Sequence, residues 1–194
     1  MTRIIGGTAG GRRIETPKGD ATRPTSDRVR EALFSMLEAW FEGSLSRIGV
    51  LDLYAGSGAI GLEAASRGAS YVVAVESDRA TADLIRRNAR TLGSVAEVAA
   101  QPVARFLGQP APTPVDLVFL DPPYPLSEDD LATDLRLLVE HGWLAEDALV
   151  VVERSRRSPE PAWPAGLQPL SGKRRMKKYG ETTLWFAEKA TPLA

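Results

Sequence analysis

The stretch Asp52-Leu53-Tyr54-Ala55-Gly56-Ser57-Gly58-Ala59-Ile60-Gly61 decides the predicted fold. It overlaps the apolar run Val50–Tyr54, which is typical of a short buried strand, and it opens the helical pattern Ile60–Arg67. Its glycines have the G-x-G-x-x-G spacing, which lets a backbone approach a bound nucleotide closely. This strand–turn–helix unit predicts a nucleotide-type cofactor at its carboxyl end.

The rest of the chain alternates strand patterns with helical patterns. The other predicted strands are Tyr71–Glu76, Val95–Ala99, Asp116–Asp121 and Ala148–Glu153. The other predicted helices are Asp27–Phe41, with Thr25 or Ser26 as its cap, Arg79–Leu92, ending at Gly93, and Asp129–His141. This alternation predicts an α/β fold with a mostly parallel sheet and helices on both faces. Residues 1–22 are predicted to form a basic β-hairpin or arm, and residues 23–190 the main domain. Residues 167–186 are expected to add two strands around a basic run.

Composition narrows the possible functions. The 194 residues contain no cysteine and one histidine, which excludes disulfides, thiolate metal sites and a Cys nucleophile, and disfavours a Ser-His triad. We find no signal peptide and no apolar run long enough to span a membrane, so we predict a cytoplasmic protein. The net charge of −1 combines +4 over residues 1–30, −10 over residues 31–152 and +5 over residues 153–194. Two basic flanks indicate a polyanionic partner.

The motif Asp121-Pro122-Pro123-Tyr124 follows a predicted buried strand. Such a motif suits the methylation of a planar exocyclic amine, whose delocalised lone pair makes it a poor nucleophile. The carboxylate of Asp121 can accept an amine hydrogen, and the prolines form a stiff turn whose carbonyls can face the same amine. Tyr124 offers a face on which a base can stack, worth about 1–3 kcal/mol per base. A simple turn at a strand end is the structural alternative.

Two carboxylates accompany the glycine-rich turn. Asp52 lies within a strand, where an unpaired carboxylate is costly to bury, and it could anchor the ammonium group of S-adenosylmethionine. Glu76 ends the next strand, where its carboxylate can accept hydrogen bonds from ribose hydroxyls. An NAD-dependent dehydrogenase also uses an acid at that position, so Glu76 does not discriminate between the two classes. Because the carboxyl ends of parallel strands form the ligand crevice, we expect both acids near Asp121–Tyr124.

With these residues, the chain resembles the bacterial 16S ribosomal RNA guanine-N2 methyltransferases of the RsmD type. The resemblance extends from Arg3 to about Phe186. It is carried by the segments Arg3-Ile4-Ile5-Gly6-Gly7, Gly11-Arg12, Arg23-Pro24-Thr25-x-Asp27-Arg28-Val29-Arg30-Glu31, Asp52–Gly58, Asp121–Tyr124 and Tyr179-Gly180-Glu181-Thr182. It implies an S-adenosylmethionine-dependent enzyme with a Rossmann-like, seven-stranded fold and an N-terminal hairpin extension. The segment Ala100–Val103 departs from the polar or acidic residue that the family usually has there.

The resemblance also implies the roles of individual residues. Asp121, Pro122, Pro123 and Tyr124 would bind and orient a flipped guanine of 16S ribosomal RNA, within the assembled small subunit. The expected cofactor residues are Asp52, Tyr54, Ala55, Gly56, Ser57, Gly58, Gly61, Glu76, Ser77, Gln101, Pro102 and Val103. The expected RNA contacts are Arg12, Arg13, Lys18, Arg23, Thr25, Lys173, Arg174, Lys177 and Lys178. The products would be S-adenosylhomocysteine and the methylated base; no metal is called for, and we predict a monomer.

Other functions remain open on the sequence. A DNA adenine-N6 or cytosine-N4 methyltransferase shares both motifs but normally carries a target-recognition insertion. A protein or small-molecule methyltransferase would not explain the basic flanks, and a dehydrogenase would not explain Asp121–Tyr124. A non-catalytic RNA-binding module is the alternative from another class, and it would show no turnover.

Overall fold

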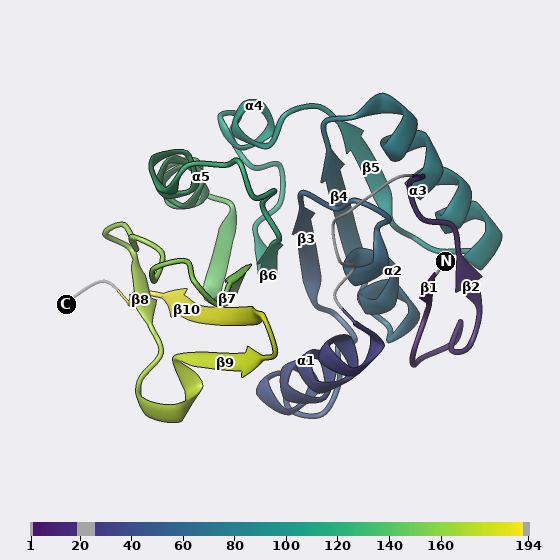
Figure 1. Ribbon diagram of the computed structural model, residues 1–194, viewed down its shortest axis with the longest axis horizontal. Helices are drawn as coiled ribbons and strands as arrows, with labels where there is room; N and C mark the ends of the chain where they lie inside the picture. Colours follow the sequence, from purple (N-terminus) through teal and green to yellow (C-terminus); the bar gives the residue numbers. More distant parts are fainter. Residues whose placement is uncertain (1, 19–25, 192–194) are drawn as a thin grey trace. The chain divides into compact units, whose positions relative to one another are not determined.

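The computed structural model describes residues 2–18 and 26–191, and these form two compact units. The first unit is Met1–Gln101 and the second is Pro102–Ala194. Figure 1 shows their helices and strands in chain order from purple to yellow. In the part of the chain that is described, no helix has the length and apolar character needed to cross a membrane.

The N-terminal unit is built on three parallel strands. β3 (Gly49–Leu53) pairs with β4 (Tyr71–Glu76), and β4 pairs with β5 (Glu97–Ala100), both in parallel register. All five residues of β3 are buried, which explains why its sequence, apart from Asp52, is apolar without alternation. The carboxyl ends of β3 and β4 consequently lie side by side, because Leu53 is paired with Val75.

Helices connect these strands. α2 (Ala59–Ser66) links β3 to β4, and α3 (Arg79–Leu92) links β4 to β5. α3 begins where the side chain of Asp78 accepts a hydrogen bond from the backbone N–H of Thr81 at 2.8 Å. It ends at Gly93, whose φ of 64° gives the left-handed cap predicted from the sequence. α1 (Asp27–Trp40) precedes them and begins at Ser26, whose Oγ accepts from the N–H of Val29.

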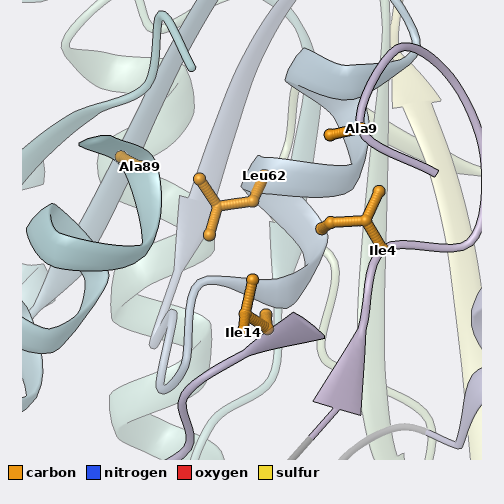
Figure 2. Packing of buried hydrophobic residues seen from close by; sticks show 5 residues of the cluster. All are labelled: Ile4, Ala9, Ile14, Leu62 and Ala89. Atoms are coloured by element: carbon orange, nitrogen blue, oxygen red, sulfur yellow. The ribbon is translucent and has the colours of Figure 1, made fainter. Parts of the chain in front are cut away.

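The first residues form a small hairpin that is packed onto the helices. β1 (Thr2–Arg3) pairs with β2 (Arg13–Ile14) in antiparallel register. Ile4, Ala9 and Ile14 are buried in one cluster with Leu62 of α2 and Ala89 of α3, as Figure 2 shows. The predicted N-terminal hairpin is therefore confirmed, and the described part of it is a packed extension of the unit's core.

The C-terminal unit contains a mixed sheet. β6 (Val115–Leu120) and β7 (Leu144–Ser155) are parallel, with α5 (Glu128–Glu140) between them in the chain. β10 (Thr182–Lys189) is antiparallel to β7 and also pairs with β8 (Leu167–Pro169) and β9 (Met176–Tyr179). Two short helices complete it, α4 (Val103–Leu107) and the 3-10 turn η1 (Gly172–Arg174). The predicted α/β class with a mostly parallel sheet is confirmed.

Several predicted boundaries need correction. The third strand begins at Glu97 and not at Val95, which lies on the surface. β7 is longer than predicted and contains an irregularity near Asp147, whose φ is 60°. The helix α4 was not predicted from the sequence, and two strands were expected where the structure has β8, β9 and β10. The alternative cap Thr25 and the predicted domain boundary at residue 22 fall outside the described residues.

Candidate cofactor loop and amine-binding turn

The glycine-rich loop after β3 has an unusual backbone. Tyr54, Gly56 and Gly58 all have positive φ values, of 58°, 56° and 79°. Tyr54 is the informative one, because a non-glycine residue in this region is strained by about 1 kcal/mol or more and such residues cluster at functional sites. The turn is closed by a hydrogen bond from the N–H of Gly58 to the carbonyl of Ala55 at 2.8 Å. The N–H of Ala55 donates to the carbonyl of Val75 at 3.0 Å, which ties the loop to the end of β4.

Asp52 is a buried carboxylate in β3, shortly before this loop in the chain. It is 2% exposed, and its Oδ2 accepts a hydrogen bond from the N–H of Gly61 at 2.9 Å. A Cβ on Gly61 would lie 3.2 Å from that Oδ2, so the glycine permits the close approach. Burial raises the pKa of Asp52 to about 7, the N–H of Gly61 acts against this, and the charge of Glu76 adds to it. A cation bound here would remove much of the cost of ionising Asp52.

Glu76 holds the loop at the end of β4. Its Oε2 accepts from the N–H of Gly56 at 3.0 Å, and its Oε1 accepts from the N–H of Asp78 at 2.9 Å. An ionised carboxylate offers about four lone-pair sites, so two backbone contacts leave capacity for further hydroxyl donors. Of the two acids predicted from the sequence, Glu76 therefore contacts the glycine-rich loop (residues 54–58), whereas Asp52 contacts Gly61 in the first turn of α2.

The other predicted cofactor residues follow β4 and β5 in the chain. Ser77 is exposed between Glu76 and the cap of α3, and Gln101 directly follows β5. Pro102 is the N-cap of α4, and Val103 is its first residue and is 4% exposed. The side chain of Val103 is thus part of the core, and a contact of Gln101, Pro102 or Val103 with adenine stays a prediction.

We expect the two glycines of the turn to differ in their tolerance of alanine. A Cβ on Gly56 would have no atom within 4 Å, whereas a Cβ on Gly58 would lie 2.7 Å from Cγ2 of buried Ile85. Gly56→Ala should cost about 1 kcal/mol for its positive φ. Gly58→Ala should cost about 1–2 kcal/mol more, because Ile85 must move. Urea unfolding of both variants measures the difference, and equal losses would contradict the packing described here.

The Asp-Pro-Pro-Tyr turn lies at the end of β6 in the C-terminal unit. Leu120 is buried, whereas Asp121 is exposed, and the side chain of Tyr124 is 75% exposed. The carbonyl of Pro123 accepts from the N–H of Leu126 at 2.9 Å, which closes the turn. The end of a buried strand thus presents an exposed acidic residue and, three residues later, an exposed large aromatic ring, the residue types that bind and stack on a planar base.

The predicted RNA contacts lie in both units. In the N-terminal unit, Arg13 and Lys18 are exposed, and the guanidinium of Arg12 donates to the carbonyls of Thr91 and Leu92. Arg12 therefore also provides hydrogen-bond donors for two carbonyl groups at the carboxyl end of α3. In the C-terminal unit, Lys173 and Arg174 form part of η1, and Lys177 and Lys178 lie on β9. Arg23 and Thr25 lie outside the described residues.

Two buried polar side chains hold separate segments of the N-terminal unit together, and neither was predicted from the sequence. Glu63 of α2 accepts hydrogen bonds from the N–H groups of Ile5 and Gly6 at 2.7 and 2.8 Å. Asn88 of α3 bonds to the backbone of Glu15 and to the carbonyl of Ser57. The only sequence signal was a polar residue on the apolar side of each helical pattern, which does not reveal the partner.

Comparisons with known proteins identify the family. The family model described as "Conserved hypothetical protein 95" matches residues 2–188. Ribosomal RNA small subunit methyltransferase D of Escherichia coli is 40% identical over 84% of this chain and 79% of its own length. The Haemophilus influenzae protein of the same name is 38% identical over 81% of this chain and 80% of its own length. A solved structure, "Putative methyltransferase yhhF from Escherichia coli", is 36% identical with a TM-score of 0.82, covering 96% of this chain and 97% of that chain.

The agreement extends over nearly the whole chain and includes both the glycine-rich loop and the Asp-Pro-Pro-Tyr turn, because both lie within the matched residues 2–188. The N-terminal hairpin, Thr2 to Ile14, falls in the same match. The chain therefore belongs to the family of Ribosomal RNA small subunit methyltransferase D, as the resemblance seen in its sequence indicated.

Proposed function

We propose that the protein transfers the methyl group of S-adenosylmethionine to the exocyclic N2 amine of a guanine in 16S ribosomal RNA of the small subunit. The observation that carries the amine chemistry is the turn after β6, where exposed Asp121 and Tyr124 flank two prolines. The family relationship supports the choice of ribosomal RNA. The cytoplasm follows as the compartment, since the substrate is a ribosomal particle.

The N-terminal unit supplies the cofactor side of this proposal. Asp52 would balance the ammonium group of S-adenosylmethionine, and Glu76 would accept hydrogen bonds from its ribose. Gly56 would let the backbone approach the cofactor, since open space surrounds its Cα on the side where a Cβ would stand. The positive φ at Tyr54 supports a functional role for the loop.

The turn after β6 would act on the base. The carboxylate of Asp121 would accept one hydrogen of the guanine amine, and a proline carbonyl would accept the other, which directs the nitrogen lone pair. Tyr124 would stack on the base after it leaves its own stack, at a cost of a few kcal/mol. Transfer would form a bond from the nitrogen to the methyl carbon as the carbon–sulfur bond breaks, with the sulfonium becoming the neutral thioether of S-adenosylhomocysteine. The methylated, positively charged nitrogen releases its proton afterwards, so Asp121 need not be a strong base. The rate gain comes mainly from proximity and orientation, with no metal required.

We expect binding of the cofactor to depend on pH through Asp52. Its pKa of about 7 means that the free protein holds a proton there at lower pH, whereas the cationic cofactor requires the carboxylate. Affinity should therefore rise as the pH increases from 5.5 to 7, by up to tenfold per unit. Calorimetric titration of S-adenosylhomocysteine, which carries the same ammonium group, over this range measures the slope. Asp52→Asn should weaken binding roughly tenfold at pH 7 and flatten the slope; a slope that survives in this variant would rule out Asp52 as the titrating group.

The substrate class is tested with labelled S-adenosylmethionine and four acceptors: small subunits from cells lacking the enzyme, naked 16S RNA, duplex DNA, and protein extract without nucleic acid. The proposal expects label in the subunits. Label in DNA alone would favour the DNA amino-methyltransferase. Cofactor binding without label in any acceptor would favour the non-catalytic RNA-binding module.

A further inference from the structure

Asn88 joins two segments of the N-terminal unit that are far apart in the sequence. It lies in the middle of α3 and is 4% exposed. Its Oδ1 accepts from the N–H of Glu15 at 2.9 Å, and its Nδ2 donates to the carbonyl of Glu15 at 3.0 Å. The same Nδ2 donates to the carbonyl of Ser57 at 3.2 Å. One amide therefore connects the chain after β2 with the glycine-rich loop.

The segment from Arg12 to Glu15, which contains β2, is held along α3 by additional contacts. The guanidinium of Arg12 donates to two carbonyls at the end of α3, and Arg87 lies 3.5 Å from the carboxylate of Glu15. Between them, Ile14 packs in the cluster that includes Ala89 (Figure 2). Residues 12–15 thus follow α3 toward Asn88, and a displacement of Glu15 would act on the amide that binds Ser57.

The conformation of the glycine-rich loop, at the other end of this connection, depends on how the peptide group between Ser57 and Gly58 is oriented. Ser57 stands between two glycines with positive φ, Gly56 and Gly58. Its carbonyl belongs to the same peptide group as the N–H of Gly58, which closes the turn on Ala55. Because glycine backbones are conformationally permissive, the peptide groups next to Gly56 and Gly58 rotate easily. A hydrogen bond to the Ser57 carbonyl from outside the turn therefore restricts the conformation of the loop. Asn88 provides that bond.

We propose that Asn88 is a positioning residue that couples RNA binding by the N-terminal segment to cofactor binding by the glycine-rich loop. The inference rests on the proposed function, which supplies both ligands. Glu15 lies between Arg13 and Lys18 in the sequence, and both are expected RNA contacts. RNA that fixes this segment fixes the backbone of Glu15 and, through Asn88, the carbonyl of Ser57. By linkage, each ligand then raises the affinity for the other by the same factor.

The coupling is measured with S-adenosylhomocysteine, which binds without turnover. Its dissociation constant is determined for the wild-type protein alone and with saturating small subunits that lack the modification. We expect affinity to rise about fivefold or more when subunits are present, the lower end of typical coupling factors. Asn88→Asp keeps the acceptor for the Glu15 N–H but loses both donations from Nδ2. In this variant we expect a factor close to one.

Glu15→Gln is the matched control, because it removes the ion pair with Arg87 and keeps the backbone contacts with Asn88. It should retain the wild-type coupling factor. Thermal unfolding shows that the variants are folded, and Asn88→Ser provides a second, uncharged loss of the amide if Asn88→Asp unfolds. An unchanged factor in the Asn88 variants, with both affinities weakened separately, would make Asn88 a merely structural residue and overturn the inference. If the wild-type protein transfers methyl groups but shows no coupling, only the role of Asn88 is overturned and the proposed function stands. If it does not bind subunits, the proposed function is overturned as well.

Discussion

Replacement of Asp121 by alanine is expected to lower the rate of methyl transfer by about 10²–10³-fold, because the guanine amine loses the acceptor that orients it. Asp121 is exposed at the end of β6 and lies outside the unit that holds the glycine-rich loop. The affinity for S-adenosylhomocysteine should therefore stay within about twofold of the wild-type value. Single-turnover kinetics with small subunits separates the chemical step from binding.

Asp121→Asn is the informative companion variant. Asparagine keeps the shape of the side chain and one acceptor oxygen but loses the charge and gains a competing donor. It should show an intermediate rate, and the two variants should bind subunits about as well as the wild-type protein. Wild-type turnover in Asp121→Ala would contradict the role of the turn, and parallel loss of cofactor affinity would indicate a structural defect instead.

Replacement of Glu63 by alanine should lower the free energy of unfolding by about 4 kcal/mol, the largest loss of stability among the variants proposed. The carboxylate of Glu63 is 0% exposed, accepts from the N–H groups of Ile5 and Gly6, and pairs with Arg67 at 2.8 Å. Alanine would leave two backbone donors and a guanidinium without this acceptor in the interior. The packing of Ile4 against Leu62 would be lost next, because the hairpin would no longer be held on α2.

Urea unfolding measures this loss of stability, and hydrogen exchange locates it. We expect faster exchange at residues 4–12, where the hairpin contacts α2, before global unfolding. Glu38→Ala is the matched control: it removes the other partner of Arg67, at 2.9 Å, but Glu38 is partly exposed and, within the described residues, has no hydrogen bond to the hairpin backbone. It should cost less than about 1 kcal/mol. Equal losses in the two variants would show that the Arg67 pair, and not the hairpin, dominates.

The elements with strong local patterns were predicted well. Tyr71–Glu76 and Arg79–Leu92 have the predicted bounds, because β-branched residues, a helix cap and a terminal glycine all act within a few residues. The helix α4 was missed since five residues after Pro102 show no complete helical period. The extra length of β7 was missed because Glu146 and Asp147 interrupt its apolar run.

The residues of the candidate site that were proposed from the sequence are those marked by a local pattern. The glycine-rich loop with Asp52, and the turn from Asp121 to Tyr124, are each contiguous and could be recognised directly. Glu63 and Asn88 could not, because their partners lie 58 and 73 residues away, and a polar residue on a helix usually faces solvent. Long-range hydrogen bonds of this kind depend on the packed fold and leave no local pattern.

The most direct test of the central claim is nucleoside analysis of 16S ribosomal RNA from small subunits that lack the modification, after incubation with the protein and S-adenosylmethionine. We expect N2-methylguanosine at a single position, absent when Asp121→Ala replaces the wild-type protein. Methyladenosine or methylcytidine in its place, or no methylated nucleoside despite bound cofactor, would contradict it.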